Sequence, residues 1–384
     1  MKPISALARP EIGQLPIYNA GLSSDAVKAR YGVDHVARLG SNENPDGPSP
    51  AVAQALVDIA TECTNYPDAS GRELSHAIAD LVQADPECIV LGNGSENLLE
   101  VLCQVFLAPG DRVVTLIPSF GLHEIYPRMM GATVEMVPTT SDMTYDVDAW
   151  CAALSRGAKL VFLSNPSNPV GCMLDVHAFR RVVDATPADA ILVVDEAYYE
   201  YAVHESGFPD ALVELRKRDR HWIVLRTFSK AWGLAGLRVG YGVASSPELA
   251  GLLHRVRTPF NVNLAAQKAA LAALSDPAHM QASVRRAIQA RENMAHALRN
   301  MGLFVAPSAG NFLFVDVGRE NGPVAEGLLA RGVIIKPWKE PGYERFIRVS
   351  VGNDQDNQRF IDALRQILRP CASAPRPVQP CVPG

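Results

Sequence analysis

Residues 221–241 read HWIVLRTFSKAWGLAGLRVGY, and this stretch decides the fold more than any other part of the chain. Its first half is a run of apolar and β-branched residues, which predicts a strand that is buried on both faces. The run ends in small and polar residues that include Lys230. Because ligands of open α/β sheets bind just beyond the carboxyl ends of the strands, this stretch predicts a covered sheet with a site at its edge.

Similar runs precede and follow this stretch and alternate with amphipathic segments. They are CIVLGNG (88–94), RVVTLIP (112–118), KLVFLSNP (159–166), AILVVDEAY (190–198) and VGYGVAS (239–245). Short apolar strands that alternate with helical segments are typical of βαβ units. We therefore predict an α/β fold whose large domain has a mostly parallel sheet flanked by helices on both faces.

The sequence pattern changes around Pro259. Residues 263–301 are rich in Ala, Arg and Gln and predict long helices, after which strand-like and helical segments alternate to about residue 368. We predict an N-terminal arm (1–40), a large α/β domain (41–256), a smaller α+β domain (257–369) that packs with the arm, and a disordered Pro-rich tail (370–384).

Composition excludes several classes of protein. The 384 residues carry a net charge of −5 with scattered basic residues, which argues against a nucleic-acid or anionic-membrane partner. The seven cysteines form no CxxC pair, so neither a disulfide framework nor a metal site is expected. No apolar run approaches the ~18 residues of a membrane span, and the N-terminus lacks a signal-peptide pattern. We expect a cytoplasmic protein.

A glycine-rich turn follows the first strand of the predicted sheet. Gly94, Ser95 and Glu96 open a helix there, where free backbone N–H groups and the helix dipole can bind a phosphate. A plain tight turn with a serine cap explains the same residues. A dinucleotide fingerprint is excluded, because Asn97 stands where the third glycine would be required.

Three charged residues stand at or near the ends of later strands. Asp195 ends an apolar strand, where a buried carboxylate needs a cation such as a protonated pyridine nitrogen; a helix cap is the alternative. Lys230 has apolar neighbours, which disfavour its ammonium form as Schiff-base chemistry requires; a surface lysine is the alternative. Arg238 is an anion partner or a structural ion pair. The order of these groups on successive strand ends is more specific than any one of them.

At this point the chain resembles the fold-type I pyridoxal-phosphate-dependent aminotransferases and, within them, the histidinol-phosphate aminotransferase family. The resemblance runs from about Leu39 to about Leu368. The motifs that carry it are SNENPDGPSP (41–50), NYPDASGRELSHAIA (65–79), SNPSNPVG (164–171), DEAYYEY (195–201), TFSKAWGLAGLRVGY (227–241), TPFNVN (258–263), PSAGNFLFV (307–315) and FIRVSVG (346–352).

The resemblance implies how pyridoxal 5'-phosphate is held. Lys230 forms the Schiff base and then moves the proton at the substrate Cα, and Asp195 keeps the pyridine nitrogen protonated. Tyr198 and Asn168 bond the phenolic oxygen, and Phe120 stacks on the ring. The cofactor phosphate is bound by residues at the glycine-rich turn and after the lysine strand: Gly94, Ser95, Glu96, Thr227, Ser229 and Arg238.

The resemblance also implies a substrate site. Arg348 binds the substrate carboxylate as a bidentate guanidinium, and Asn44 and Asn311 line the site. Tyr18 closes over the substrate from the arm, and Tyr66 reaches the neighbouring active site of a homodimer, where it binds the cofactor. Lys336 is a further candidate for binding the substrate. Two features depart from the family pattern: Lys336 stands where an arginine is common, and the following WKEPGYERF (338–346) replaces a Gly-rich stretch.

The leading hypothesis is a ping-pong transfer of the amino group from L-histidinol phosphate to 2-oxoglutarate, which gives imidazole acetol phosphate and L-glutamate. An aromatic or other amino-acid aminotransferase is the next choice. A lyase similar to threonine-phosphate decarboxylases is an alternative of another class, which carbon dioxide release would identify. A regulatory binding protein on the same scaffold is a third, against which the intact Lys230, Asp195 and Arg238 argue.

Overall fold

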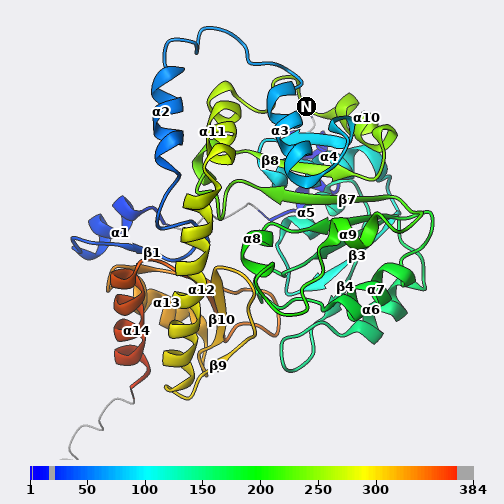
Figure 1. The fold of residues 1–384 in the computed structure, drawn as a ribbon. Coiled ribbons are helices and arrows are strands. Elements are labelled where there is room, and N and C mark those ends of the chain that lie inside the picture. The colour runs from blue at the N-terminus through cyan, green and yellow to red at the C-terminus, as the bar shows by residue number, and fades with distance from the viewer. Residues whose placement is uncertain (2, 17–21, 370–384) are drawn as a thin grey trace, which may run out of the picture.

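The structure, a computed structural model, describes residues 1, 3–16 and 22–369 and is built around a seven-stranded sheet (Figure 1). The strand order is β2-β8-β7-β6-β5-β3-β4, and all neighbours are parallel except that β8 is antiparallel to both β2 and β7. The strands are β2 (Ile89–Gly92), β3 (Arg112–Ile117), β4 (Thr133–Pro138), β5 (Leu160–Ser164), β6 (Ile191–Asp195), β7 (Trp222–Thr227) and β8 (Gly240–Ala244). The predicted α/β class with a mostly parallel sheet is confirmed.

Alternate residues of the central strands belong to two separate apolar clusters, one on each face. In β6, Leu192 and Val194 pack on one face, and Ile191 and Val193 pack on the other. This period of two is the geometry of a strand that is covered on both sides. The first face is covered by α3 (Arg72–Val82), α6 (Val147–Leu154), α7 (Val176–Ala185), α9 (Ala211–Leu215) and α11 (Leu264–Ser275); the second is covered by α4 (Ser95–Phe106), α5 (Leu122–Met129) and α10 (Pro247–Val256).

Strand β8 brings the ends of distant strands to one edge of the sheet. Gly240 pairs with Gly92 on β2 and with Thr227 on β7, and all three lie at the same level of the sheet. Since β8 is antiparallel to both neighbours, β2 and β7 point the same way. The start of α4 after β2 is therefore placed beside the residues that follow β7.

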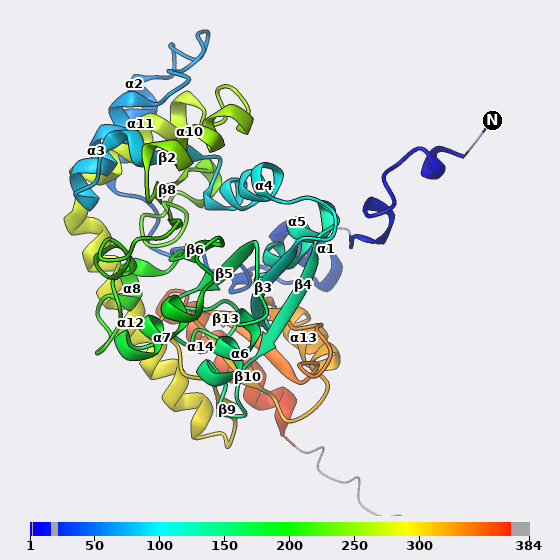
Figure 2. The same ribbon diagram turned by 90° about the vertical axis from the view of Figure 1, so that its right-hand side faces the viewer.

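A second, antiparallel sheet lies with α13 and α14 at the bottom of both views (Figures 1 and 2). Its order is β12-β13-β10-β9. The elements of this part are β9 (Phe304–Val305), β10 (Phe312–Asp316), α13 (Asn321–Leu329), β12 (Lys336–Pro337), β13 (Phe346–Ser350) and α14 (Asp354–Leu368). The long helix α12 (Pro277–Arg299) contacts both α8 (Tyr199–Ala202) and this sheet, and so links the two parts.

The N-terminal part of the chain is tied to the C-terminal part. Strand β1 (Ala37–Arg38) pairs in parallel with β11 (Val333–Ile334). The remaining helices are α1 (Ser24–Tyr31), α2 (Pro50–Asp58) and the 3₁₀ turns Ile4–Ala6, Ile12–Gln14, Pro86–Cys88 and Ala235–Leu237. The domain boundaries stay predictions, and the predicted tail (370–384) lies outside the described residues. Phe314 and Phe346 of the second sheet join the apolar core under the first sheet. Within the described residues, every helix is too short or too polar to cross a membrane.

Candidate active site

The predicted lysine lies at the carboxyl edge of the large sheet. The Nζ atom of Lys230 donates to the Ser41 carbonyl at 2.9 Å and lies 5.9 Å from the centre of the Tyr198 ring. Burial lowers the pKa of Lys230 to about 7, and the nearby Arg348 guanidinium acts in the same direction. An amine that loses its proton near neutral pH is a usable nucleophile and base.

Asp195 is buried at the end of β6 and is held on two sides. Its Oδ1 accepts the Ala197 backbone N–H at 3.1 Å, and its Oδ2 lies 3.1 Å from His123 Nε2. The fully buried His123 ring is stacked on Phe162, with centroids 5.3 Å apart, and its Nδ1 lies 3.2 Å from Ser119 Oγ. These contacts fix the direction of the carboxylate.

Sequence reasoning missed His123. The residue follows Phe120 by three positions, at the start of α5, and the two rings meet edge to face at 5.7 Å. The available signal was a histidine within one helical turn of the predicted stacking residue. Its contact with Asp195 spans 72 residues and is not visible in local spacing.

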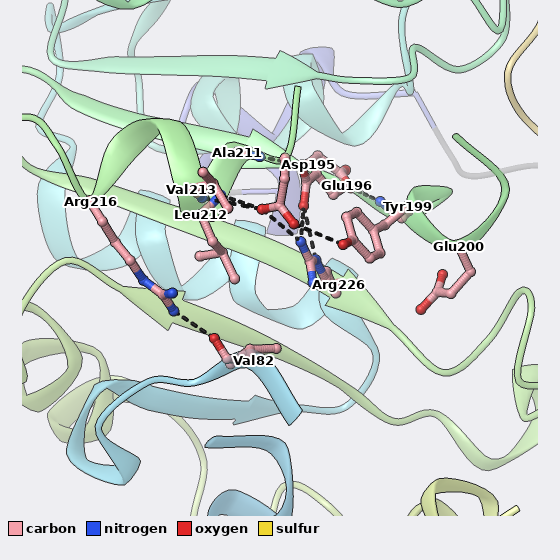
Figure 3. Close-up of polar contacts among 12 residues, drawn as sticks. Val82, Asp195, Glu196, Tyr199, Glu200, Ala211, Leu212, Val213, Arg216 and Arg226 are labelled. Atoms are coloured by element: carbon pink, nitrogen blue, oxygen red, sulfur yellow. Dashed lines mark hydrogen bonds and ion pairs between the residues drawn. The ribbon is translucent and has the colours of Figure 1, made fainter. Parts of the chain in front are cut away.

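A second polar network lies on the opposite face of the same strand ends (Figure 3). Glu196 and Arg226 are buried, and Arg226 Nε donates to Glu196 Oε2 at 2.9 Å. The guanidinium also lies 3.4 Å from the centre of the Tyr199 ring. Burial raises the pKa of Glu196 to about 7 although Arg226 opposes it. Because neighbouring residues of a strand point to opposite faces, this ion pair joins β6 to β7 directly behind Asp195 and Thr227.

The glycine-rich turn forms an anion cradle with Arg238. A Cβ atom on Gly94 would lie 2.5 Å from Arg238 Nη2, and one on Gly240 would lie 2.4 Å from the Ser95 nitrogen. Gly94 also has a φ of +77°, and the close atoms at Gly240 belong to the backbone, so glycine is favoured at both positions. The first turn of α4 points free N–H groups at the cradle, as phosphate sites require.

Side chains around the cradle hold Arg238 and the loop after β7. Arg238 Nη1 lies 3.4 Å from Ser229 Oγ, and Nη2 lies 3.6 Å from Glu96 Oε2. Thr227 Oγ1 accepts the Ser229 backbone N–H at 3.1 Å. All six residues predicted to hold a phosphate thus surround one small region.

Tyr198 is buried and belongs to a hydrogen-bonded group that involves the N-terminal part of the chain. Asn42 Nδ2 donates to the Tyr198 hydroxyl at 2.9 Å, and Asn42 Oδ1 accepts from Ser350 Oγ at 2.8 Å. Asn311 Nδ2 donates to the Asn42 carbonyl at 3.1 Å. Burial raises the pKa of Tyr198. Asn42 was not predicted, since the sequence offered no way to separate it from Asn44.

Arg348 lies between the two sheets. Its Nη1 donates to Asn168 Oδ1 at 2.7 Å, and its Nη2 donates to the Gly40 carbonyl at 2.5 Å. Lys336 on β12 is the direct cross-strand partner of Arg348 on β13. Burial lowers the pKa of Lys336, and Arg348 adds to the effect. Two cations thus stand side by side, and Arg348 also acts on the pKa of Lys230.

Two other predicted residues, Asn44 and Tyr66, make contacts outside the predicted cofactor and substrate groups, and a third is outside the part of the chain that the structure describes. Asn44 donates to the Ala231 carbonyl at 2.9 Å and accepts from Ser283 Oγ at 2.8 Å, so its side chain supports the loop after Lys230. Tyr66 is 83% exposed and is stacked on Phe260 with centroids 4.6 Å apart. Tyr18 lies outside the described residues. The roles predicted for these three stay predictions.

Comparisons with known proteins identify the family of the chain. The family model described as aminotransferase class I and II matches residues 34–364. Histidinol-phosphate aminotransferase 3 of Rhizobium meliloti (strain 1021) is 48% identical over 359 residues, which are 94% of this chain and 97% of that protein. Histidinol-phosphate aminotransferase 1 of Mesorhizobium japonicum is 48% identical over 368 residues, which are 96% of this chain and 100% of that protein.

A solved structure supports the cofactor as well. Histidinol-phosphate aminotransferase from Sinorhizobium meliloti, in complex with pyridoxal-5'-phosphate, superimposes with a TM-score of 0.85 at 30% identity and covers 94% of this chain and 97% of its own. A buried amine, a carboxylate behind it and an anion cradle beside it are the groups that this cofactor needs. The chain belongs to the pyridoxal-phosphate-dependent class I and II aminotransferases, in the branch of the histidinol-phosphate aminotransferases.

Proposed function

We propose that the chain transfers the amino group of L-histidinol phosphate to 2-oxoglutarate by a ping-pong route, giving imidazole acetol phosphate and L-glutamate. The observation that carries the proposal is the Lys336–Arg348 pair, two cations opposite each other on β12 and β13. L-Histidinol phosphate carries a phosphate dianion and no carboxylate, so a pair of cations suits it. The relatives that are 48% identical bear the name of this activity.

The residues of this chain fit the cofactor. We propose that its phosphate lies in the cradle of Gly94, Ser95 and Arg238, where a larger side chain would intrude. Phe120 covers one face of its ring, and Asp195 pairs with its nitrogen. When bound, pyridoxal phosphate supplies an electron sink for the electrons released at the substrate Cα.

Two hydrogen-bond directions follow from the partners in the structure. Since Asn168 Oδ1 accepts from Arg348, the Asn168 amide N–H groups point away from Arg348 and toward the site. Since the Tyr198 hydroxyl oxygen accepts from Asn42, its own proton is directed elsewhere. Both groups can therefore donate to a phenolic oxygen, as we propose for that of the cofactor.

Lys230 moves the proton at the substrate Cα. Its lowered pKa keeps a large fraction of the amine unprotonated near neutral pH, which suits a general base that must later return the proton. Arg348 holds the carboxylate of glutamate and 2-oxoglutarate in the second half of the reaction. Lys336 adds the second positive charge when the phosphate of the first substrate is bound.

We further propose that the enzyme is a cytoplasmic homodimer. The stacked pair of Tyr66 and Phe260 is exposed, at 83% and 39%, and such a pair of rings suits burial against a second copy. The five cysteines in the described ranges are all unpaired, which suits a reducing compartment. Light scattering of the active enzyme tests the dimer.

Amino donors distinguish the candidate functions. The purified holoenzyme is mixed with histidinol phosphate, phenylalanine or phosphothreonine, and the loss of the cofactor's visible band is followed without acceptor. We expect histidinol phosphate to react fastest. Rapid reaction of phenylalanine with none for histidinol phosphate would overturn the substrate, and carbon dioxide release without a keto product would indicate a lyase.

A further inference from the structure

The segment Trp338–Tyr343 connects β12 to β13 and is the stretch whose composition departs from the family pattern. On one side it is fixed to the second sheet by aromatic rings. Phe314 is stacked on Phe346 with centroids 4.8 Å apart, Trp338 meets Phe314 edge to face at 5.9 Å, and Tyr343 meets Phe346 at 5.9 Å. The segment therefore moves with the sheet that carries Lys336.

On its other side the segment contacts the loop that follows β3 of the large sheet. The Tyr343 hydroxyl donates to the Ile117 carbonyl at 3.3 Å. Glu340 is half-buried, and the nearby Ser119 backbone N–H and Trp338 indole N–H act to lower its pKa. Among the described residues, Glu340 Oε2 and Trp338 Nε1 are each buried without a partner at hydrogen-bond distance.

The contacted loop leads directly to the cofactor site. Ser119 Oγ lies 3.2 Å from His123 Nδ1, and His123 in turn holds Asp195. Phe120 packs on the same histidine at 5.7 Å. A displacement of residues 117–119 would therefore move the ring face and the carboxylate partner together.

We infer that Tyr343 and Glu340 are positioning residues that hold Ser119 and Phe120 in a fixed place relative to Lys336, and so align the cofactor with the strand that binds the substrate. The inference rests on the proposed function, because it assigns the cofactor's ring to Phe120 and the substrate's anion to Lys336. Neither residue is required to touch the reacting atoms.

The charge of Glu340 changes the strength of this hold. Burial raises its pKa to about 7, and the carboxylate of Glu124 on α5 adds to the effect; Glu124 itself pairs with Arg128 at 2.7 Å. Tyr343 also faces the carboxyl group. Above about pH 7 the ionised group attracts the Ser119 N–H, and below that pH the protonated group attracts it less.

The test compares Glu340→Gln, Glu340→Ala and Tyr343→Phe with the control Glu344→Gln. Glu344 lies in the same connection and is exposed, and among the contacts described its side chain accepts only a local bond from the Gly342 N–H at 2.9 Å. Three properties are measured: amide hydrogen exchange of the peptide around 116–124 in the apoenzyme, circular dichroism of the bound cofactor against pH, and kcat separately from KM.

We expect faster exchange in that peptide and a kcat that falls about tenfold for Glu340→Ala and Tyr343→Phe, with a smaller change in KM. Glu340→Gln should retain most of the rate and lose the change of cofactor dichroism near pH 7. The control should match the wild type. If Glu340→Ala does not fold, Tyr343→Phe and Glu340→Gln decide the question by the same measurements.

Failure of this inference differs from failure of the proposed function. If Tyr343→Phe and the Glu340 variants match Glu344→Gln in exchange and in cofactor dichroism, the positioning role is wrong, even in an active enzyme. A wild type that ignores histidinol phosphate overturns the proposed substrate instead, and the exchange data on the apoenzyme still decide whether the segment holds residues 117–119.

Discussion

The cofactor side and the substrate side of this active site are built in different ways. The cofactor side comes from one sheet: Asp195 and Lys230 follow neighbouring strands, and the ion pair of Glu196 and Arg226 joins those strands from behind. The substrate side is assembled from separate stretches, in which Arg348 reaches both Gly40 and Asn168. The comparison indicates that one sheet fixes the chemistry, whereas the choice of amino donor depends on how distant segments meet.

The sharpest test of the cofactor side removes its amine. We expect Lys230→Ala to lower the rate of amino transfer by about 10⁴-fold or more, because both the covalent hold and the proton carrier are lost. The visible band of the bound cofactor should disappear while far-ultraviolet circular dichroism is unchanged. Lys268→Ala, at an exposed lysine paired with Glu73 at 2.8 Å, is the control. If Lys230→Ala keeps the visible absorbance band of a covalently bound cofactor, the assignment of Lys230 as the Schiff-base residue is wrong.

Removal of the Asp195 charge, which we propose lies beside the nitrogen of the cofactor ring, is expected to have the next largest effect. Asp195→Asn keeps the shape and the neighbour His123 but loses the negative charge, so we expect kcat to fall about 10²- to 10³-fold. Asp210→Asn is a matched control, because Asp210 caps α9 and lies near Arg226 on the other face. The control should lose little activity and little stability, because asparagine caps a helix about as well as aspartate. Equal rates for the two variants would remove Asp195 from the chemistry.

On the substrate side, Arg348→Lys tests the planar fork. Lysine cannot reproduce the pair of bonds to Asn168 and Gly40 or the fork to a carboxylate, so we expect KM for glutamate to rise about 10- to 100-fold. The spectrum of the bound cofactor should change little. A loss confined to kcat, with KM unchanged, would place Arg348 on the cofactor side of the comparison.

The pH dependence of cofactor binding tests the cofactor side alone, because it depends on the pKa of Lys230. Since burial lowers the pKa of Lys230 to about 7, the free amine prevails above that pH and the protonated form prevails below it. The apoenzyme should therefore capture pyridoxal phosphate at a rate that falls about tenfold per pH unit below pH 7 and levels off above it. Stopped-flow absorbance measures this rate. A plateau reached only near pH 10 would contradict the lowered pKa.

The smallest expected effect belongs to the residue that departs from the family pattern. Lys336→Ala should raise KM for histidinol phosphate about three- to tenfold, the loss of one half-exposed charge, and leave KM for glutamate nearly unchanged. Lys336→Arg should restore or improve the wild-type value. Equal changes of KM for both substrates would show that Lys336 does not bind the phosphate of histidinol phosphate.

The sequence was informative where the function is local to a strand end. Asp195, Thr227 and Lys230 each follow an apolar run, so their place at the edge of the sheet could be predicted. The partners of these residues could not, because His123 contacts Asp195 across 72 residues and Asn42 reaches Tyr198 across 156. Such pairs are decided by the packing of whole elements, which a pattern of one segment does not contain.

The antiparallel direction of β8 also could not be predicted from the pattern of apolar residues. VGYGVAS is as apolar as the parallel strands, and its neighbours Gly92 and Thr227 are 135 positions apart in the chain. The contact of Arg348 with the Gly40 carbonyl could not be predicted for the same reason. Sequence therefore indicated the groups of the cofactor side and the class of reaction, but not the long-range contacts that hold them.

The place of β8 between β2 and β7 has a consequence for how the enzyme is made. The cradle needs the glycine at position 240 against the start of α4, and β2 gains its only neighbour in the described sheet from β8. A chain that is still on the ribosome and ends before that glycine would have the phosphate turn and the lysine without the strand that unites them. Pyridoxal phosphate would thus be bound only after the chain has been synthesised through residue 240, and shorter nascent fragments should not retain it.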